Sequence, residues 1–275
     1  MPQSPLLQDS DLDLAFEVAV AAGTQLLDRP AVLELDAKST PTDIVTQMDK
    51  NAEALIVEAL VNARPEDGLL GEEGAQREAL SGRTWVIDPI DGTINYLYQL
   101  PFWCVSIGLR SATNEGLVGV VHAPALGVTW VASKGQGAWI IENGVWRRMS
   151  VSTQHSLAMA LMGTGFGYSS IRRTAQARVL NSVLPHVRDI RRLGSCAIDL
   201  CLVAQGVLDG YYERGVHVWD HAAGSLIARE AGATVSGIFG NIEGNDMLVA
   251  TNPHIYDDLV AILEASHADK DEVQE

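Results

Sequence analysis

Two aspartates on either side of a proline, Asp88 and Asp91, are the residues of this sequence best placed to do chemistry. They follow an apolar, β-prone run over residues 84–87, and Pro89, which has no amide proton, is expected to end the pairing of that strand. A helix can begin directly after Gly92. A strand that brings two carboxylates to a helix N-terminus can bind hard cations and a phosphate together. An exposed turn is the alternative interpretation, because Asp, Pro and Gly are common turn residues.

Four more acids are candidates for the same chemistry, although each has an ordinary structural explanation. Asp49 and Asp220 stand at the start of helical patterns, where an acid can simply begin or cap a helix. Glu72 lies in a turn-like segment between two glycines, and Glu213 follows a strand-like run, so both could be solvated surface acids. A shared function would require these residues, which are far apart in the sequence, to meet in the folded chain.

Composition limits the class of partner. The chain has 275 residues, enough for one large or two modest domains, and its formal net charge is −16. Such a charge repels nucleic acids and anionic membranes, which disfavours binding driven by phosphate neutralisation. An acidic protein that acts on an anionic substrate needs local positive charge, and metal ions are the obvious source.

The sequence also predicts a cytoplasmic location. Residues 1–10 are polar, so we expect no signal peptide, and no apolar run of about 18 residues could span a membrane. The cysteines Cys104, Cys196 and Cys201 form no Cys-x-x-Cys pair. They are therefore expected to be reduced thiols, without a zinc site.

The pattern of elements changes near residue 150. Apolar residues at helical spacing predict one helix after Ser10 and another after Asp49, and short β-prone runs between residues 102 and 150 predict an antiparallel sheet. After residue 150, strands alternate with helices. We therefore expect an α+β domain over residues 1–149 and an α/β domain over residues 150–275, with a charged, disordered tail from residue 267.

Several of these segments together resemble the signatures of the inositol monophosphatase family. They are Gly71-Glu72-Glu73, the run from Trp85 to Thr93, and Trp219-Asp220-His221-Ala222-Ala223-Gly224. Residues 38–46, 192–197 and 211–213 also resemble that family's pattern, and the likeness extends from about residue 12 to 265. Each motif is weak alone, but the set is specific.

The resemblance implies a layered α-β-α-β-α fold and a magnesium-dependent, lithium-sensitive phosphomonoesterase that is usually a dimer. It places the first Mg²⁺ on Glu72, Asp88 and the carbonyl of Ile90. It places the second on Asp88, Asp91 and Asp220. All of these ligands are oxygen atoms, which favours Mg²⁺ over zinc.

The resemblance also assigns the remaining site residues. Glu72, helped through water by Asp49, serves a weaker third ion, and Thr93 pairs with Asp49 to orient the attacking water. The amides of Gly92 and Thr93 hold the phosphate, which Asp91 and Asp220 also border. The residues expected to contact the alcohol part of the substrate are Gly194, Ser195, Cys196 and Glu213.

Elementary electrostatics agrees with a metal site. Asp49, Glu72, Asp88, Asp91 and Asp220 would together carry a charge of −5. Two like charges about 4 Å apart repel by about 4 kcal/mol at an effective dielectric constant of about 20. Such a cluster needs cations, or protonation of some members. Two or three Mg²⁺ ions would neutralise the acids and part of a phosphate dianion.

The sequence departs from the family pattern at a few positions beyond the phosphate-binding segment. Ile94, Tyr96 and Tyr98-Gln99 replace residues that are more common there, and Cys196 replaces a smaller residue such as alanine. These changes concern the shape of the pocket rather than catalysis. For Cys196, a buried packing role is the simpler interpretation.

Two classes of function fit this reading. The first is hydrolysis of myo-inositol 1-phosphate or a related polyol phosphate, favoured by Glu213, whose carboxylate could accept hydrogen bonds from vicinal hydroxyls. Histidinol phosphate, fructose 1,6-bisphosphate and 3′-phosphoadenosine compounds are rival substrates on the same scaffold. The second is a regulatory protein that binds partners in a transcription complex, as some bacterial relatives do.

Overall fold

The computed structural model describes residues 9–30, 35–37 and 44–271 of the chain. Most of the predicted polar loop over residues 38–46 lies outside these residues, so its expected role stays a prediction. The helices are α1 (Ser10–Leu27), α2 (Gln47–Ala63), α3 (Thr93–Leu97), α4 (Ser170–Val183), α5 (Cys196–Ala204), α6 (Val218–Glu230) and α7 (Tyr256–Ala265), with short 3₁₀ turns η1 (Pro124–Leu126), η2 (Leu157–Met159) and η3 (Leu184–His186).

The strands complete the list of elements. They are β1 (Leu35–Ala37), β2 (Ile44–Thr46), β3 (Gly68–Gly71), β4 (Gln76–Arg77), β5 (Thr84–Asp91), β6 (Cys104–Arg110), β7 (Gly116–Ala123), β8 (Val128–Ser133), β9 (Ala138–Glu142), β10 (Val145–Arg148), β11 (Leu161–Thr164), β12 (Asp189–Arg191), β13 (Gly210–Glu213), β14 (Thr234–Ser236) and β15 (Leu248–Thr251).

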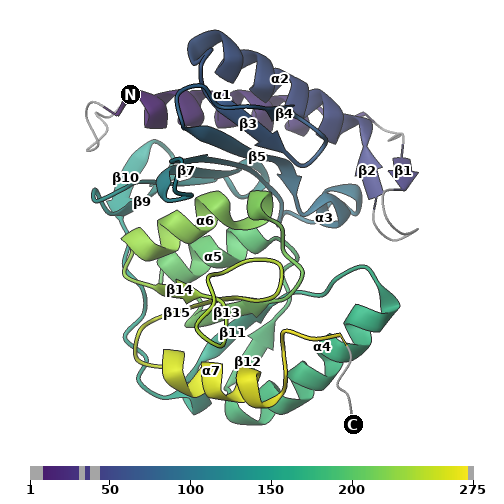
Figure 1. The fold of residues 1–275 in the computed structure, drawn as a ribbon, viewed down its shortest axis with the longest axis vertical. Coiled ribbons are helices and arrows are strands. Elements are labelled where there is room, and N and C mark those ends of the chain that lie inside the picture. Colours follow the sequence, from purple (N-terminus) through teal and green to yellow (C-terminus); the bar gives the residue numbers. More distant parts are fainter. Residues whose placement is uncertain (1–8, 31–34, 38–43, 272–275) are drawn as a thin grey trace.

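Helices and sheets alternate in layers along the long axis of the molecule (Figure 1). Helices α1 and α2 cover one face of an eight-stranded sheet, and α5 and α6 lie between that sheet and a five-stranded one. Helices α4 and α7 cover the outer face of the second sheet. The α-β-α-β-α arrangement expected from the family resemblance is confirmed.

The eight-stranded sheet brings two predicted site segments together. Its order is β10-β9-β8-β7-β6-β5-β3-β4, and every neighbouring pair is antiparallel except β3 and β5. That parallel pair sets Gly71 opposite Ile87, and the Glu72 amide donates to the Ile87 carbonyl at 3.1 Å. Since parallel strands run in the same direction, Glu72, just after β3, and Asp88, within β5, lie side by side at this edge of the sheet.

Strand β5 does not end at the proline, contrary to expectation. It continues to Asp91, and the register against β6 shifts between Asp88, which faces Ser106, and Asp91, which faces Cys104. Proline is tolerated where a bulge interrupts the ladder, because no amide hydrogen is needed there. The bulge places both aspartates at one end of the same strand.

The second sheet has the order β12-β11-β13-β15-β14. Strands β12, β11 and β13 run parallel, and β15 is antiparallel to its neighbours. The predicted alternation of strands and helices therefore produces a mixed sheet. The predicted division at residue 150 falls between β10 and β11, where one sheet ends and the other begins.

Helix α6 lies unusually close to the first sheet because glycines face it. Gly108 and Gly119 lie opposite each other on β6 and β7. A Cβ atom at Gly119 would lie 2.7 Å from the Ala223 carbonyl oxygen, and one at Gly108 would lie 3.2 Å from the Ala222 Cβ. The small residues after Asp220 therefore serve packing, and this close contact brings the N-terminus of α6 to the strand that carries Asp88.

Filling this contact should destabilise the fold. We expect Gly119→Ala to lower the free energy of unfolding by about 1–3 kcal/mol, since an added methyl group in a close-packed region forces its neighbours apart. Urea unfolding measures the change. Gly244→Ala is the matched control, because a Cβ atom there meets nothing within 4 Å. Equal stability of the two variants would contradict the proposed close contact.

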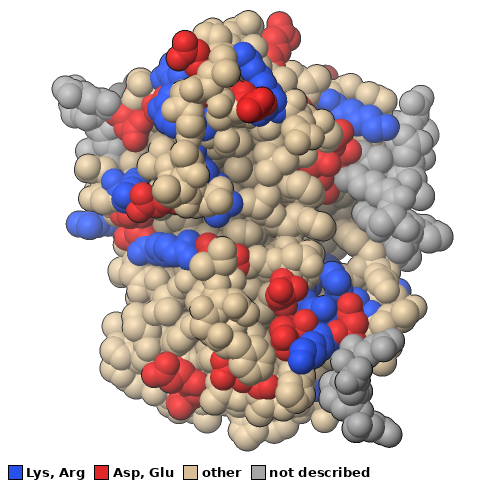
Figure 2. All heavy atoms as spheres, in the orientation of Figure 1, with Lys and Arg blue, Asp and Glu red and all other residues tan. Residues whose placement is uncertain are grey.

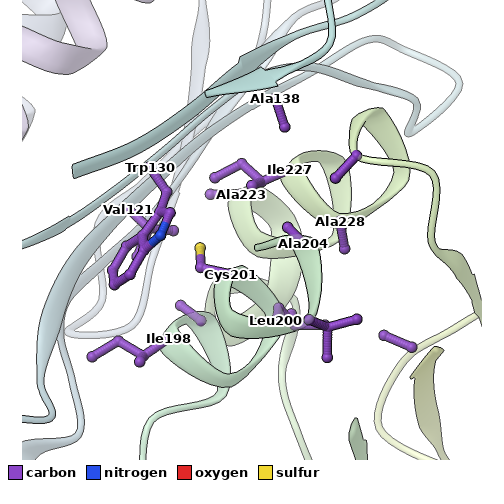
Figure 3. Close-up of a cluster of buried hydrophobic side chains, with 14 of the residues drawn as sticks. Val121, Trp130, Ala138, Ile198, Leu200, Cys201, Ala204, Ala223, Ile227 and Ala228 are labelled. Carbon is purple, nitrogen blue, oxygen red and sulfur yellow. The ribbon is translucent and has the colours of Figure 1, made fainter. Parts of the chain in front are cut away.

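The layer between the sheets is filled by apolar side chains (Figure 3). Trp130 and Val121 from the first sheet pack with Ile198 and Cys201 of α5 and with Ile227 of α6. A second buried cluster lies between α1, α2 and the first sheet, and a third lies under α4 and α7. Helix α5 is therefore packed against buried side chains on both sides.

The C-terminal segment is ordered further than predicted. The tail from residue 267 was expected to be disordered, but residues 267–271 are described and Ala268 is buried. Asp271 pairs with Arg172, at 3.3 Å from its Nε atom, and with Arg214, and its carbonyl accepts from Arg178. These contacts fix the segment, because one carboxylate there meets several arginines.

Candidate active site

One cavity of about 460 Å³ gathers most of the predicted site residues. It is bordered by the end of β5, the start of α3, the start of α5, the end of β13 and the start of α6. The predicted residues that line it are Glu72, Asp88, Ile90, Asp91, Gly92, Thr93, Gly194, Cys196, Glu213 and Asp220. Residues distant in sequence therefore share one concave surface.

Asp88 and Asp91 are not residues of an exposed turn. Their exposed fractions are 1% and 9%. Asp88 Oδ1 accepts the Ile90 amide at 3.0 Å, while Asp91 Oδ2 accepts from the Ser195 hydroxyl at 2.6 Å and the Ala197 amide at 2.7 Å. Each carboxylate is thus fixed through one oxygen by protein donors, which orients it as outer hydrogen bonds orient metal ligands.

Helix α3 begins at the end of the same strand. Gly92 precedes it with φ of 96°, in the left-handed region that glycine adopts readily. A Cβ atom there would also lie 2.8 Å from the Phe102 carbonyl oxygen. Glycine is therefore required for the chain to turn from β5 into α3 and to present the first amides of α3, which have no partner within the helix.

Asp49 lies behind the cavity rather than in its wall. It is fully buried at the third position of α2, where Oδ2 accepts the Thr46 amide at 2.8 Å. The Thr93 hydroxyl lies 3.2 Å from Asp49 Oδ1 and 3.1 Å from the Ile90 carbonyl oxygen, two acceptors for one hydrogen. The helix-start interpretation of Asp49 is therefore correct, and the same residue also contacts Thr93.

Asp220 likewise has two positions to satisfy: it lies at the start of a helix and in the wall of the cavity. It occupies the third position of α6, and its Oδ2 accepts the His217 amide at 2.6 Å. It also lines the cavity. His217 is exposed and stacks on Trp219, with ring centroids 4.8 Å apart, so its imidazole is a surface group at the rim.

Like charges meet in this cavity. The pKa of Asp88 is raised well above its ordinary value, first by burial and then by Glu72, Asp91 and Asp220. The pKa of Asp220 is raised by burial and by Asp91 and Glu72. Burial raises the pKa of Asp91 to about 6, although the donors Ser195 and Ala197 oppose the change. The ionised cluster is therefore unfavourable unless a cation compensates it.

The donor set fits a hard divalent cation. Glu72, Asp88, Asp91, Asp220 and the Ile90 carbonyl offer only oxygen atoms, the ligands that Mg²⁺ prefers. Within the described ranges, no three Asp, Glu, His or Cys side chains already surround one point as a formed cage. The fit consequently rests on the chemistry of the donors and on their mutual repulsion.

The start of α5 supports Asp91 from the other half of the chain. Ser195 is 2% exposed, and its hydroxyl donates to Asp91 and accepts the Ile198 amide at 3.2 Å. It is not among the described residues that line the cavity, in contrast to Cys196 and Gly194. The cysteines Cys104, Cys196 and Cys201 are buried and unpaired, as predicted.

Glu213 occupies a tight position at the end of β13. The Tyr211 hydroxyl, on the same face of the strand, donates to its carboxylate. A Cβ atom at Gly165 would overlap that carboxylate, so only glycine fits beside it. Burial raises the pKa of Glu213 to about 7, opposed by Tyr211 and Arg192. No role was assigned to Tyr211 from the sequence. Its two-residue spacing from Glu213 was a usable signal, because residues two apart in a strand point to the same face.

Part of the cavity wall was missed in the sequence. The cavity is also lined by Phe166, Tyr168, Arg172 and Arg192, to which no role was assigned from the sequence. Figure 2 shows basic and acidic residues mixed beside α4, where Arg172 and Arg214 pair with Asp271. The wall opposite in charge to the aspartates comes from the first turn of α4, which carries Arg172, and from the loop after β12, which carries Arg192. No local pattern indicates that these two segments lie beside the aspartates.

No described helix is both long and apolar enough to cross a membrane.

Residues 7–268 match the model of the inositol monophosphatase family. The inositol-1-monophosphatase of Mycobacterium leprae is 45% identical over 235 residues, covering 83% of this chain and 80% of that protein. The Nus factor SuhB of Pasteurella multocida is 37% identical over 256 residues, covering 90% and 94%. The solved structure of Mycobacterium tuberculosis SuhB has a TM-score of 0.81 at 39% identity, covering 94% of this chain and 97% of that one.

Proposed function

We propose, because this chain belongs to the inositol monophosphatase family and is a phosphoric monoester hydrolase, that it hydrolyses myo-inositol 1-phosphate or a related polyol phosphate with Mg²⁺ as cofactor. One observation carries the proposal. The acids Glu72, Asp88, Asp91 and Asp220 share a cavity with Glu213, so a place for cations adjoins a carboxylate suited to hydroxyl groups.

The proposed ligands of Mg²⁺ are Glu72, Asp88, Asp91, Asp220 and the Ile90 carbonyl. When bound, Mg²⁺ ions supply positive charge for the phosphate and lower the pKa of a water molecule. The protein's contribution is orientation: the Ile90 amide fixes Asp88, and the Ser195 hydroxyl and Ala197 amide fix Asp91. Hydrogen bonds of this kind, from protein donors to the ligand carboxylates, fix the orientation of the ligands before the substrate binds.

Thr93 and Asp49 are proposed to orient the attacking water. Thr93 lines the cavity, and its hydroxyl hydrogen is directed to Asp49 or to the Ile90 carbonyl. Its oxygen can therefore accept a hydrogen bond from water. The first amides of α3, after Gly92, are proposed to donate to the phosphate oxygens, since they have no partner inside the helix.

Glu213 is proposed to select the polyol. We expect Glu213→Gln to raise KM for inositol 1-phosphate by about 10-fold or more, since hydrogen bonds to charged groups contribute about 1.5–3 kcal/mol. KM for a small aryl phosphate should change little. In the wild type, kcat/KM for inositol 1-phosphate divided by kcat/KM for the aryl phosphate should rise as pH increases through about 7. The reason is that the Glu213 carboxyl, whose pKa is about 7, is protonated below that pH and ionised above it.

The variant itself provides the control for this pH dependence. In Glu213→Gln the ratio should no longer change with pH, since the amide does not ionise. Comparing two phosphates at each pH cancels the ionisation of the phosphate group. Equal loss for both substrates, or an unchanged pH profile, would contradict the proposed role of Glu213.

A nucleotide substrate is a second candidate, and a specific observation favours it. Phe166 and Tyr168 could stack on a base, and Arg172 and Arg192 could hold a further anionic group, as all four line the cavity. A panel with Mg²⁺ would separate the candidates: inositol 1-phosphate, histidinol phosphate, fructose 1,6-bisphosphate and a 3′-phosphoadenosine compound. The proposal requires the highest kcat/KM for the inositol phosphate, and a higher value for any other compound would overturn it.

A regulatory role in transcription is a further candidate, since a relative 37% identical to this chain is named a Nus factor. Relatives with 44–45% identity are named inositol-1-monophosphatase, which favours hydrolysis. The net charge of −16 favours a protein partner over direct RNA contact. Full biological function of a variant without hydrolytic activity would favour the regulatory role.

The proposal also includes a homodimer, inhibition by lithium and a cytoplasmic location. These follow from the family resemblance and from the sequence. Light scattering, activity with added lithium and cell fractionation test them in turn.

A further inference from the structure

A glutamate outside the cavity holds the turn that carries Glu72. Glu53 lies on α2, one helical turn after Asp49 and on the same buried face, and it is 6% exposed. A buried carboxylate is costly unless protein donors satisfy it. The groups that donate hydrogen bonds to Glu53 therefore show which segment of the chain this buried carboxylate holds in place.

Both oxygens of Glu53 accept backbone amides from the β3–β4 turn. Oε2 accepts the Glu73 amide at 2.9 Å, and Oε1 accepts the Ala75 amide at 2.9 Å. The same turn is closed by the Gly71 amide, which donates to the Ala75 carbonyl at 2.7 Å. A carboxylate bound to two amides at once defines both the position and the orientation of the turn.

Glu72 is consequently fixed from two sides. Its own amide donates to Ile87 of β5, and the next amide in the chain donates to Glu53. Gly71 makes room for this arrangement, because a Cβ atom there would overlap the Glu53 carboxylate. Helix α2 thus supports the turn with Glu53 and contacts Thr93 through Asp49.

We infer that Glu53 is a positioning residue, which sets the backbone of Glu72 for binding of a divalent cation. The inference rests on the proposed function, in which Glu72 is a Mg²⁺ ligand. Glu53 contacts neither substrate nor cation in this scheme. Its contribution is that the turn is already in place when the cation arrives, so the cation need not order it.

Two variants of Glu53 distinguish an effect of the position of its carboxylate from an effect of its charge. Glu53→Gln keeps the shape but turns an amide group toward one of the two backbone donors, and Glu53→Asp keeps the charge but shortens the side chain. In both, the Mg²⁺ concentration for half-maximal activity should rise roughly 10-fold, the lower end of the cost of losing an outer partner of a metal ligand, because Glu53 holds the turn and not the Glu72 side chain itself. At saturating Mg²⁺, kcat should return to within a few-fold of wild type.

Glu58→Gln is the matched control, because Glu58 is exposed on the same helix and the charge change is equal. It should leave the Mg²⁺ dependence within about twofold of wild type. Gly71→Ala, which displaces the Glu53 carboxylate without changing it, should reproduce the Glu53 variants.

A second readout does not depend on catalysis. In the metal-free protein, the amides of Glu73 and Ala75 should exchange with deuterium faster in Glu53→Gln and Glu53→Asp than in wild type or Glu58→Gln. Calorimetric titration with Mg²⁺ should show the matching loss of affinity. These measurements remain valid if the wild type proves to have no Mg²⁺-dependent phosphatase activity, a result that would refute the proposed function alone.

Three results would overturn the inference. Wild-type Mg²⁺ dependence in both variants would show that Glu53 serves stability only. An effect in Glu53→Gln but not in Glu53→Asp would assign the effect to charge and not to placement. Failure of both variants and of Gly71→Ala to fold, judged by circular dichroism, would make Glu53 a general stability residue.

Discussion

Replacing Asp88 by asparagine should abolish nearly all phosphatase activity, by roughly 10³-fold or more in kcat/KM. Loss of one preorganised electrostatic group costs about 10²–10³ in rate, and Asp88 is proposed to serve two cations. It is 1% exposed and lies among Glu72, Asp91 and Asp220, at the centre of the acidic cluster. Steady-state kinetics with inositol 1-phosphate at several Mg²⁺ concentrations measures the loss.

The same variant should not lose stability. Because the pKa of Asp88 is raised by burial and by neighbouring acids, the ionised form opposes folding, and the neutral amide should preserve or increase the melting temperature in EDTA. Asp246→Asn, at an exposed position, is the control and should leave kcat/KM unchanged. Wild-type turnover by Asp88→Asn would refute the proposed metal site.

Removal of Mg²⁺ by EDTA should abolish turnover reversibly and make stability depend strongly on pH. The pKa of Asp91 rises from 3.8 to about 6 in the folded protein, so the folded chain holds a proton that the unfolded chain has released. Stability is then lost as pH increases through about 6. At about 1.4 kcal/mol per pKa unit, Asp91 alone accounts for about 3 kcal/mol over the interval from pH 3.8 to about 6, and for about half of that above pH 5.

Melting temperatures at pH 5 and pH 8 test this result. In EDTA the melting temperature at pH 8 should be clearly lower than at pH 5. Millimolar Mg²⁺ should restore the melting temperature at pH 8, because a cation stabilises the ionised acids. Asp91→Asn in EDTA should show a smaller difference between the two pH values. The same pH dependence with and without Mg²⁺, together with turnover that persists in EDTA, would contradict the site.

The sequence predicted the elements that have a regular period. The helices α1 and α2 and the strands β6 to β9 lie close to their expected ranges, because their apolar residues recur with the period of a helix or a strand. Asn143-Gly144, a dipeptide typical of tight hairpins, forms the turn between β9 and β10, with φ of 50° and 76°. Local rules were sufficient for these elements.

Other features depend on contacts between distant residues. Strand β5 passes Pro89 because β6 accommodates a bulge, and no property of the proline itself predicts that. Glu53 lies on the buried face of α2, and an acid at such a position was a signal that the periodic pattern could have given. Asp271 is ordered by three arginines, which a charged C-terminal composition does not indicate.

The acids of the cavity were found through motifs and not through their spacing. Asp49 and Asp220 each have a complete structural explanation as helix-start residues, and that explanation is correct. Their second role emerges only when α2 and α6 are packed on the sheet, where Gly108 and Gly119 admit α6. The roles of these residues in catalysis stay predictions.

The hydrogen bonds that Asp49 and Asp220 accept at the starts of α2 and α6 bear on how such proteins change over evolution. Asp49 and Asp220 each accept the amide that precedes their helix, and losing such a cap costs about 0.5–2 kcal/mol. A descendant that gave up turnover and kept only a scaffolding role would still be selected to retain both aspartates. Asp88 starts no helix. It accepts the Ile90 amide within its own bulge, and its buried charge opposes folding once no cation is bound. In a lineage drifting toward a pseudoenzyme, position 88 should be the first of the three to change.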